Sequence, residues 1–293
     1  MFKGSIPALV TPMRHDGAID FESWDRLLDF HLEAGSDAIV VGGTTGESPT
    51  LERGELEDLI RSARRRVAAR IPVIAGSGTA GTAKSVALSR AAEAAGADAL
   101  LVVTPYYNRP TQEGLFRHFT AIADAVGIPV ILYNVPGRTA CDLLPETIGR
   151  LSRHPRIVGV KEATGSVERA EQILRLVEPG FVVLSGDDAT AERLMRVGAR
   201  GVISVTANAV ARAMHEMCAA ALAGDHEGAA RIDAALAPLH AKLFVEPNPI
   251  PVKWAVHRMG LAGETLRLPL VPLSSGQRPV VEAALRAAGV TLD

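Results

Sequence analysis

Short apolar runs alternate with longer amphipathic segments through most of the chain. The apolar runs are rich in valine, isoleucine and leucine, which is typical of buried strands. The segments between them have helical spacing, as in residues 23–32, where Trp24, Leu27 and Leu28 fall on one face. The predicted strands cover residues 6–10, 38–41, 73–76, 99–103, 130–133, 157–161, 182–185 and 201–204. The pattern therefore predicts a repeated strand–helix unit.

Glycine follows several of the predicted helices, in residues 34–37, 95–98 and 197–200, where a helix C-terminus favours a left-handed residue. Eight almost wholly apolar strands that alternate with helices indicate a parallel sheet covered by helices, and eight such units close into a TIM barrel, the (β/α)8 fold. A doubly wound open sheet is the alternative. That fold usually carries a GxGxxG turn after its first strand, and this chain has none there.

The pattern changes after residue 204 to alanine-rich helices, predicted at 209–223 and 226–243. We therefore expect a catalytic barrel in residues 1–224 and a helical C-terminal appendage in residues 225–293. The proline-rich segment 245–251 disfavours helix. We expect it to form a stiff extended connector that positions the last helices and takes no part in chemistry.

Composition narrows the classes of function. The chain of 293 residues is 47% hydrophobic and 22% charged, and its net charge of −2 is spread without runs of one sign. This gives no electrostatic footprint for nucleic acid or an anionic membrane, so small neutral or anionic molecules are the expected partners. Cys141 and Cys218 are far apart, which predicts neither a disulfide framework nor a zinc site and favours a reducing cytoplasm. We expect no secretory leader and no membrane-spanning segment.

The predicted strand 157–161 ends on a lysine, Lys161. An amine at the mouth of an apolar strand is partly desolvated, which favours its neutral form, and a neutral amine can attack a carbonyl to form a Schiff base. The alternative is a lysine that reaches past the strand end into solvent. This segment by itself favours the alternative.

Other strand ends change that balance, because the active site of such a barrel lies at the C-terminal ends of its strands. Residues 42–47 (GGTTGE) form a glycine-rich turn that could hold a carboxylate, or could simply be a tight connection to a helix. All three tyrosines follow strands, two in residues 104–110 and the third at Tyr133. A phenol can pass a proton, and the nearby Arg138 can bind a carboxylate. Since sequential strands are neighbours, Lys161 should lie beside Tyr133, which favours the Schiff base.

Metal binding is not expected. Asp187 and Asp188 could hold a divalent cation, but no residue at a neighbouring strand end completes a ligand set, so we favour a helix N-cap. The histidines, including His118, His215 and His240, fall mostly in predicted helices and lack metal-ligand spacing.

Three motifs in these positions together resemble one family: residues 43–47 (GTTGE), 133–136 (YNVP) and 159–162 (GVKE). They resemble the pyruvate-dependent class I aldolase and lyase superfamily and, within it, the 4-hydroxy-tetrahydrodipicolinate synthase (dihydrodipicolinate synthase) family. The resemblance extends over nearly the whole chain. It includes residues 104–110, 184–188, 201–208 and 242–254.

The resemblance implies a lyase that joins pyruvate to L-aspartate 4-semialdehyde, a step of diaminopimelate and lysine biosynthesis. In this family Lys161 would form the imine with pyruvate, and Tyr133 would relay protons. Thr44 and Tyr107 would complete the relay, with Tyr107 reaching into the site of a neighbouring subunit. Such enzymes are commonly homotetramers built as a dimer of dimers. Because the imine itself accepts electrons, no cofactor or metal is implied.

The resemblance also assigns the substrate-binding residues. Backbone N–H groups of Thr44 and Thr45 would hold the carboxylate of pyruvate, and Arg138 would hold that of the semialdehyde. Gly186 and Ile203 would line the pocket.

One departure concerns regulation. Lysine-inhibited members of the family hold lysine with histidine, asparagine and glutamate side chains in a cleft at the dimer interface. Ser48 and Tyr106 remain here, but other cleft positions are changed. The residues at those positions are Arg53, Leu56, Ala80 and Lys84. Lys84 puts a positive charge where an amino group needs an anion, so we expect lysine to inhibit weakly or not at all.

Two alternatives stay open. An aldolase of sialic acid or of 2-keto-3-deoxy sugar acids would share the lysine and the tyrosine but accept a polyhydroxy aldehyde. Arg138 argues for a substrate with a second carboxylate instead. A barrel that only senses a keto acid is the other alternative, although lysine, tyrosine and threonine are all in place.

Overall fold

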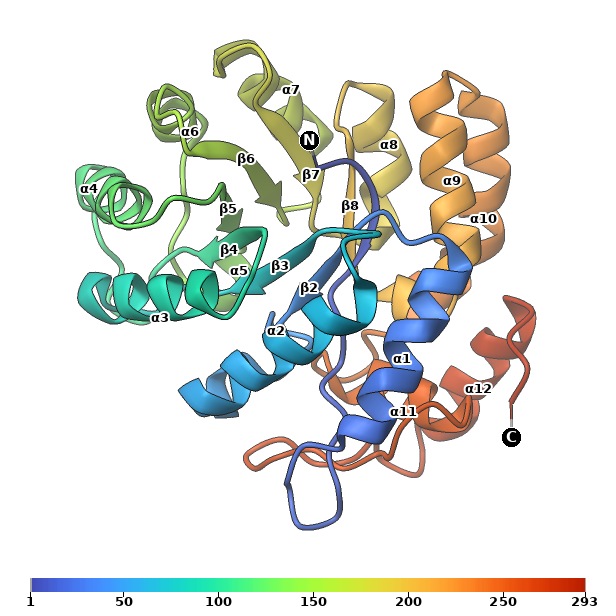
Figure 1. Cartoon of the computed structure of the whole chain (residues 1–293). Helices are drawn as coiled ribbons and strands as arrows, with labels where there is room; N and C mark the ends of the chain where they lie inside the picture. Colours follow the sequence, from blue (N-terminus) through green and yellow to red (C-terminus); the bar gives the residue numbers. More distant parts are fainter. Residues whose placement is uncertain (1, 293) are drawn as a thin grey trace.

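The computed structural model describes residues 2–292 and has eight parallel strands at its centre (Figure 1). Each strand pairs with its neighbour in the order β1-β8-β7-β6-β5-β4-β3-β2. An isolated parallel bridge between Ala8 and Val40 joins the two remaining edges, so the sheet closes into a barrel. The strands are β1 (Gly4–Pro7), β2 (Ile39–Val41), β3 (Val73–Gly76), β4 (Ala99–Val103), β5 (Val130–Asn134), β6 (Ile157–Glu162), β7 (Val182–Ser185) and β8 (Gly201–Ser204). The predicted TIM barrel is confirmed.

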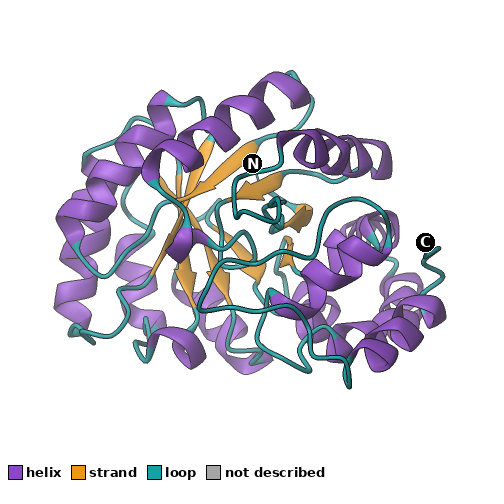
Figure 2. Ribbon diagram, turned by 90° about the horizontal axis from the view of Figure 1, so that it is seen from below, coloured by secondary structure: helices purple, strands orange, loops and turns teal. Residues whose placement is uncertain are grey.

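Helices surround the strands on all sides in the view of Figure 2. The helices around the barrel are α1 (Phe21–Ala34), α2 (Arg53–Val67), α3 (Thr82–Ala94), α4 (Gln112–Asp124), α5 (Pro136–Thr139), α6 (Pro145–Leu151), α7 (Val167–Leu176) and α8 (Ala191–Arg196). The later helices are α9 (Ala211–Ala223), α10 (His226–Lys242), α11 (Ile250–Arg258) and α12 (Arg278–Ala287), and three 3-10 turns are η1 (Ser48–Thr50), η2 (Asp188–Thr190) and η3 (Thr206–Asn208). We find no helix among residues 2–292 that combines the length and the apolar character of a bilayer-spanning segment.

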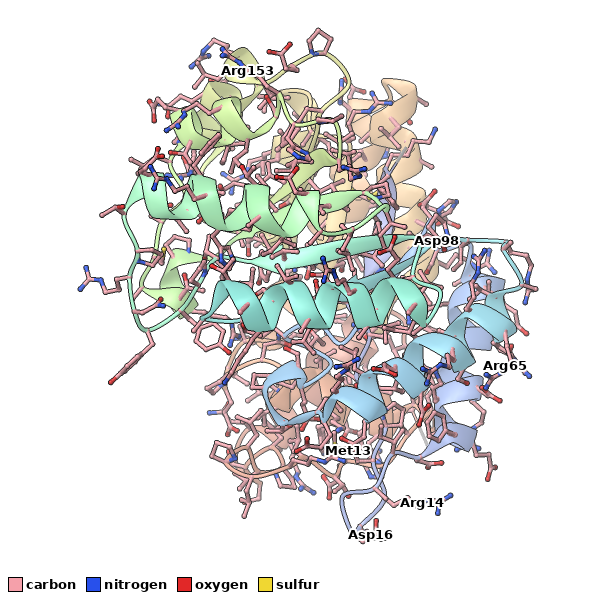
Figure 3. The ribbon with its side chains drawn as sticks, turned by 60° about the vertical axis from the view of Figure 1, so that its left-hand side comes forward. Met13, Arg14, Asp16, Arg65, Asp98 and Arg153 are labelled. Atoms are coloured by element: carbon pink, nitrogen blue, oxygen red, sulfur yellow. The ribbon has the colours of Figure 1, made fainter. Side chains whose placement is uncertain are left out.

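Local signals explain how the first helix is placed. The Asp20 side chain accepts hydrogen bonds from the N–H groups of Glu22 and Ser23 and so caps α1. Gly35 ends the helix in a left-handed conformation with φ of 84°, as its position in the sequence predicts. Before α1 the chain makes a turn held by a bridge between Met13 and Ile19, which projects from the edge of the molecule in Figure 3.

The strands have two buried faces. On β4, Leu100 and Val102 belong to the larger cluster between strands and helices, whereas Leu101 belongs to the cluster inside the barrel. This alternation follows from the two-residue period of a strand. On β5 it turns Leu132 outward and Tyr133 into the barrel.

Two predicted boundaries are wrong. The first strand was expected at residues 6–10 but spans Gly4–Pro7. The N–H of Ala8 makes the last bond to β8, at 2.8 Å to the carbonyl of Ser204, and the N–H of Leu9 then bonds across the seam to the carbonyl of Val40 at 3.0 Å. The segment 245–251 is not extended throughout, since α11 begins at Ile250 and contains Pro251 in its first turn. Proline is tolerated there because first-turn N–H groups have no partner within the helix.

His31 is a buried titratable group in the layer between α1 and the barrel. Its Nδ1 lies 3.1 Å from the hydroxyl of Ser36, and its Nε2 has no hydrogen-bond partner within residues 2–292. Complete burial lowers the pKa of His31 from 6.5 to about 3. The folded protein therefore keeps this ring neutral in mild acid.

We predict that His31→Asn flattens the acid dependence of stability. Below pH 6.5 the unfolded chain protonates His31 while the folded chain does not, so acid favours unfolding until about pH 3. This group contributes about 1.4 kcal/mol of unfolding free energy per pH unit in that window. Urea unfolding at a series of pH values measures the slope. The exposed His15→Asn should keep the wild-type slope, and equal slopes in all three proteins would contradict the prediction.

Candidate active site

Lys161 and Tyr133 meet inside the barrel. The register of β5 and β6 pairs these two residues directly, and strand alternation points both side chains inward. The Lys161 Nζ lies 4.4 Å from the centre of the Tyr133 ring. Only 5% of Lys161 is exposed, so its amine does not reach into solvent as the alternative interpretation required.

Gly186 directly follows β7, and Ile203 lies on β8. The N–H of Gly186 bonds to the carbonyl of Glu162 at 2.8 Å, which brings the backbone of β7 against Lys161. A Cβ atom on Gly186 would lie 2.9 Å from the Lys161 Cε and 2.6 Å from the Ala163 Cβ. Ile203 is fully buried in the inner cluster that contains Tyr133. Glycine at position 186 therefore leaves the space that the lysine chain occupies.

The glycine-rich turn after β2 is folded by its own backbone. Gly42 has φ of +64°, and a Cβ there would lie 2.4 Å from a methyl group of Leu56, so both conformation and space require glycine. The N–H groups of Gly46 and Ser48 bond to the carbonyl of Gly43 at 3.1 and 3.2 Å. The turn thereby curls back on itself.

This curl leaves two successive backbone N–H groups free. Those of Thr44 and Thr45 donate to no acceptor within residues 2–292. Adjacent unpaired N–H groups in a turn form a concave site for an anion. The arrangement suits a small carboxylate, as the turn sequence suggested.

Residues from the C-terminal region hold the turn in place, and the sequence-based interpretation missed them. Lys253 on α11 forms a buried ion pair with Glu47, whose other oxygen accepts the N–H of Arg267 at 3.0 Å. Desolvation lowers the pKa of Lys253, and the Glu47 carboxylate partly offsets this. The Asn248 amide donates to the Thr45 hydroxyl at 3.1 Å. The sequence feature that could have revealed this support is Lys253 itself, a lysine within the otherwise apolar first part of α11.

Arg138 on α5 stands near the same segment, since its Nη2 donates to the Asn248 carbonyl at 3.3 Å. A cavity of about 430 Å³ opens here and is lined by Thr44, Tyr133 and Arg138 among others. Lys161 contacts the Tyr133 ring but is not itself among the lining residues. The structure thus gathers an amine, a phenol, free amides and a guanidinium around one end of the barrel.

Tyr107 does not join this group within one chain. It has φ of +74°, and its side chain is 93% exposed. The neighbouring Tyr106 is 41% exposed and lines the cavity. A role for the Tyr107 hydroxyl at the site of a second subunit stays a prediction.

The two aspartates after β7 act separately. The Asp188 carboxylate accepts the Ser204 hydroxyl and the N–H groups of Val205 and Thr206 at 2.5, 2.9 and 3.0 Å, while Asp187 accepts the Thr190 hydroxyl at 2.7 Å. Asp188 therefore caps the turn that follows β8, and η2 itself has no side-chain cap. The prediction that one of these aspartates is a cap is therefore right, but the prediction that it caps the helix after β7 is wrong. Residues 2–292 contain no cluster of three potential metal ligands among His, Cys, Asp and Glu.

The positions that the resemblance assigns to a regulatory cleft divide into two groups. Ser48, Arg53, Leu56 and Tyr106 line the cavity. Ala80 and Lys84 are not among its lining residues, and Lys84 is exposed in the first turn of α3. The charged residues that line the cavity are two cations, Arg53 and Arg138, and one anion, Glu52.

We predict that Gly186→Ala greatly weakens the reactivity of Lys161 while the protein still folds. The new methyl group must displace the lysine chain, and a displacement of this kind costs on the order of tenfold or more in rate. Reductive trapping with pyruvate and borohydride, followed over time by intact mass, measures the reactivity.

Gly81→Ala is the matched control, because no atom lies within 4 Å of a Cβ at that position. The prediction fails if Gly186→Ala is trapped as fast as the control variant.

Comparisons with known proteins place this geometry in context. The family model described as "Dihydrodipicolinate synthetase family" matches residues 1–288. The chain is 57% identical over 287 residues to the 4-hydroxy-tetrahydrodipicolinate synthase of Methylibium petroleiphilum, covering 98% of both chains.

Two solved structures are also closely similar. The chloride-inhibited dihydrodipicolinate synthase of Acinetobacter baumannii, crystallised with pyruvate, superposes with a TM-score of 0.98 at 49% identity, covering 99% of this chain and 100% of that one. The dihydrodipicolinate synthase of Aquifex aeolicus gives 0.97 at 43% identity and covers 100% of both chains.

Proposed function

The chain belongs to the dihydrodipicolinate synthetase family, and from this premise we propose how its residues carry out the family's reaction. The protein is a lyase of the diaminopimelate and lysine pathway that condenses pyruvate with L-aspartate 4-semialdehyde to 4-hydroxy-tetrahydrodipicolinate. The observation that carries the proposal is the buried Lys161 amine over the ring of Tyr133, which lines one cavity together with the turn that has two free N–H groups.

Lys161 is the nucleophile. Its amine adds to the keto carbon of pyruvate, and loss of water gives an imine that draws electrons from the adjacent methyl group. Loss of a methyl proton then gives an enamine, whose carbon attacks the aldehyde carbon of the second substrate. The amino group of that substrate finally adds to the imine carbon, closes the ring and releases Lys161. Tyr133 is placed to carry protons in these steps because its phenol lies beside the amine.

Two separate groups bind the two substrate carboxylates. The free N–H groups of Thr44 and Thr45 hold the carboxylate of pyruvate, which orients its keto carbon toward Lys161. Arg138, which lines the cavity, holds the carboxylate of the semialdehyde through its guanidinium. Gly186 and Ile203 shape the wall around the lysine chain. The covalent imine on Lys161 makes a cofactor unnecessary.

A neighbouring subunit completes the proton relay. Tyr107 stands 93% exposed on a loop with the half-exposed Tyr106, and two aromatic rings in solvent are typical of a surface that another chain covers. We assign the hydroxyl of Tyr107 to the site of the partner, where it joins Thr44 and Tyr133. The assembly is then at least a dimer, and a homotetramer built as a dimer of dimers fits the family. The two buried free cysteines fit the cytoplasm.

We predict that pyruvate with borohydride adds one covalent adduct to the wild-type chain and none to Lys161→Ala. Peptide mapping should place the adduct on Lys161, and the exposed Lys84→Ala should react like the wild type. Turnover with L-aspartate 4-semialdehyde should exceed turnover with a sugar aldehyde, because only the semialdehyde offers a carboxylate to Arg138.

The outcomes separate the alternatives. An adduct with preferred turnover of the sugar aldehyde would indicate a sugar acid aldolase. A wild-type chain without any adduct would indicate a barrel that only senses the keto acid.

We also predict that lysine at millimolar concentration inhibits turnover weakly or not at all. Arg53 and Arg138 line the cavity with a single carboxylate, Glu52, and Lys84 lies on the first turn of α3, so an incoming ammonium group meets more cations than anions. A like-charge contact costs about 1 kcal/mol at 4 Å even in water. Initial rates over a lysine series measure the effect. Lys84→Glu together with Ala80→Asn should increase inhibition, and strong inhibition of the wild type would refute the prediction.

A further inference from the structure

Asn134 and Glu162 directly follow Tyr133 and Lys161 in their strands and pair with each other in the same register. Strand alternation turns them away from the barrel interior and into the layer beneath the helices. Both are fully buried there, although other outward positions of these strands, such as Leu132, are apolar. A buried carboxylate is costly unless it is paired and hydrogen-bonded. The chain therefore maintains an expensive polar pair immediately behind its reactive residues.

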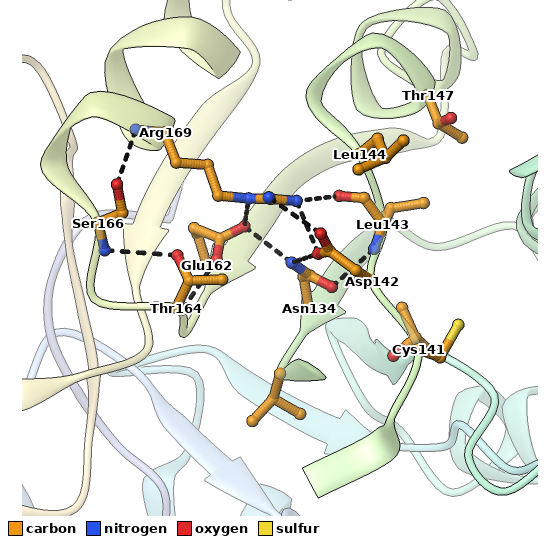
Figure 4. A network of polar contacts seen from close by, with 12 residues as sticks. Asn134, Cys141, Asp142, Leu143, Leu144, Thr147, Glu162, Thr164, Ser166 and Arg169 are labelled. Atoms are coloured by element: carbon orange, nitrogen blue, oxygen red, sulfur yellow. Dashed lines mark hydrogen bonds and ion pairs between the residues drawn. The ribbon is translucent and has the colours of Figure 1, made fainter. Parts of the chain in front are cut away.

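Arg169 on α7 provides the charge that Glu162 requires (Figure 4). Its Nε donates to the Glu162 Oε2 at 3.2 Å, and the Asn134 amide donates to the same oxygen at 3.1 Å. The other oxygen of Glu162 accepts the N–H of Thr164 at 2.9 Å. Both oxygens are thus held by donors from three different positions.

The remaining nitrogens of Arg169 reach the segment between α5 and α6. They donate to the two oxygens of Asp142 at 2.8 and 3.1 Å and to the carbonyl of Leu143 at 2.6 Å. The Asn134 side chain binds the same segment, since its amide donates to Asp142 at 3.0 Å and its carbonyl accepts the N–H of Leu143 at 2.9 Å. We call Asn134, Asp142, Glu162 and Arg169 the Arg169 network.

We propose that Arg169 is a positioning residue for Lys161 and Tyr133, acting through Glu162 and Asn134. The planar guanidinium fixes several acceptors in one geometry, which a flexible ammonium group cannot do. Each strand residue that the network holds is bonded through the backbone to a reacting residue, so a shift of one moves the other. This inference rests on the proposed function, because it concerns the geometry of imine formation.

The competing explanation is that the network only stabilises the fold. Removal of Arg169 alone leaves two carboxylates without their cation and destabilises the protein under either explanation. Two variants separate the cases. Arg169→Lys keeps the positive charge but loses the fork, and the double variant Glu162→Gln with Arg169→Gln removes one charge of each sign. Replacing a buried ion pair by neutral groups is often tolerated in stability.

We predict that both variants lower kcat on the order of 10- to 100-fold, while the melting temperature of at least the charge-balanced one stays near that of the wild type. KM for pyruvate should change less than about threefold, because the carboxylate site after β2 lies outside the network. The rate of imine trapping with pyruvate and borohydride should fall in parallel with kcat. A purely structural network would not lower kcat in a protein of wild-type stability.

Arg64→Gln is the matched control. Arg64 pairs with Asp98 at 3.0 Å and also joins a helix to a strand, but at the N-terminal end of β4 (Asp98 is labelled in Figure 3). This variant should keep the wild-type kcat. A wild-type kcat in either network variant would overturn the proposal. If Arg169→Lys lowers both kcat and the melting temperature and the double variant restores both, the proposal is also overturned, because stability alone then explains the loss. A wild-type chain that forms no adduct would instead refute the proposed function itself.

Discussion

The register between β5 and β6 is the constraint on which the site depends. It sets Tyr133 beside Lys161 inside the barrel and, one residue later, Asn134 beside Glu162 outside it. A slip by one residue would exchange the faces, moving the carboxylate into the barrel and the lysine under the helices. Reactivity inside and the polar contacts outside are therefore two consequences of one pairing.

The C-terminal region is part of the site, because it joins elements that are far apart in the sequence. Asn248 bonds through its side chain to Thr45 after β2 and through its carbonyl to Arg138 on α5. The two proposed carboxylate sites thus share one support. The attraction between Glu47 and Lys253 is largely offset by the cost of desolvating both charges, so this buried pair adds little net stability. It does favour one position of the turn over others.

The fold could be predicted from the sequence because strands of a closed barrel are buried on both faces and so form unbroken apolar runs. Lys161 stood out for the same reason, as a charge at the end of such a run. Lys253 gave a similar signal, but its partner Glu47 is distant in the chain and could not be identified from the pattern. The same holds for the contacts of Asn248 with Thr45 and of Arg169 with Asp142. Asp188 shows this limit, because its carboxylate caps a turn 16 residues further on. The domain boundary at residue 224 stays a prediction.

Burial by itself does not make a lysine a nucleophile, and this chain contains the comparison. Lys253 is completely buried, but its amine is committed to the Glu47 carboxylate, and attack on a carbonyl would break that pair. Lys161 is 5% exposed and makes no ion pair within residues 2–292. Its neighbour is the aromatic face of Tyr133, which supplies a weaker attraction than a carboxylate and leaves the amine free to react. The group that each amine contacts therefore distinguishes the structural lysine from the reactive one. The partner of Lys161 is Tyr133, which also lines the cavity.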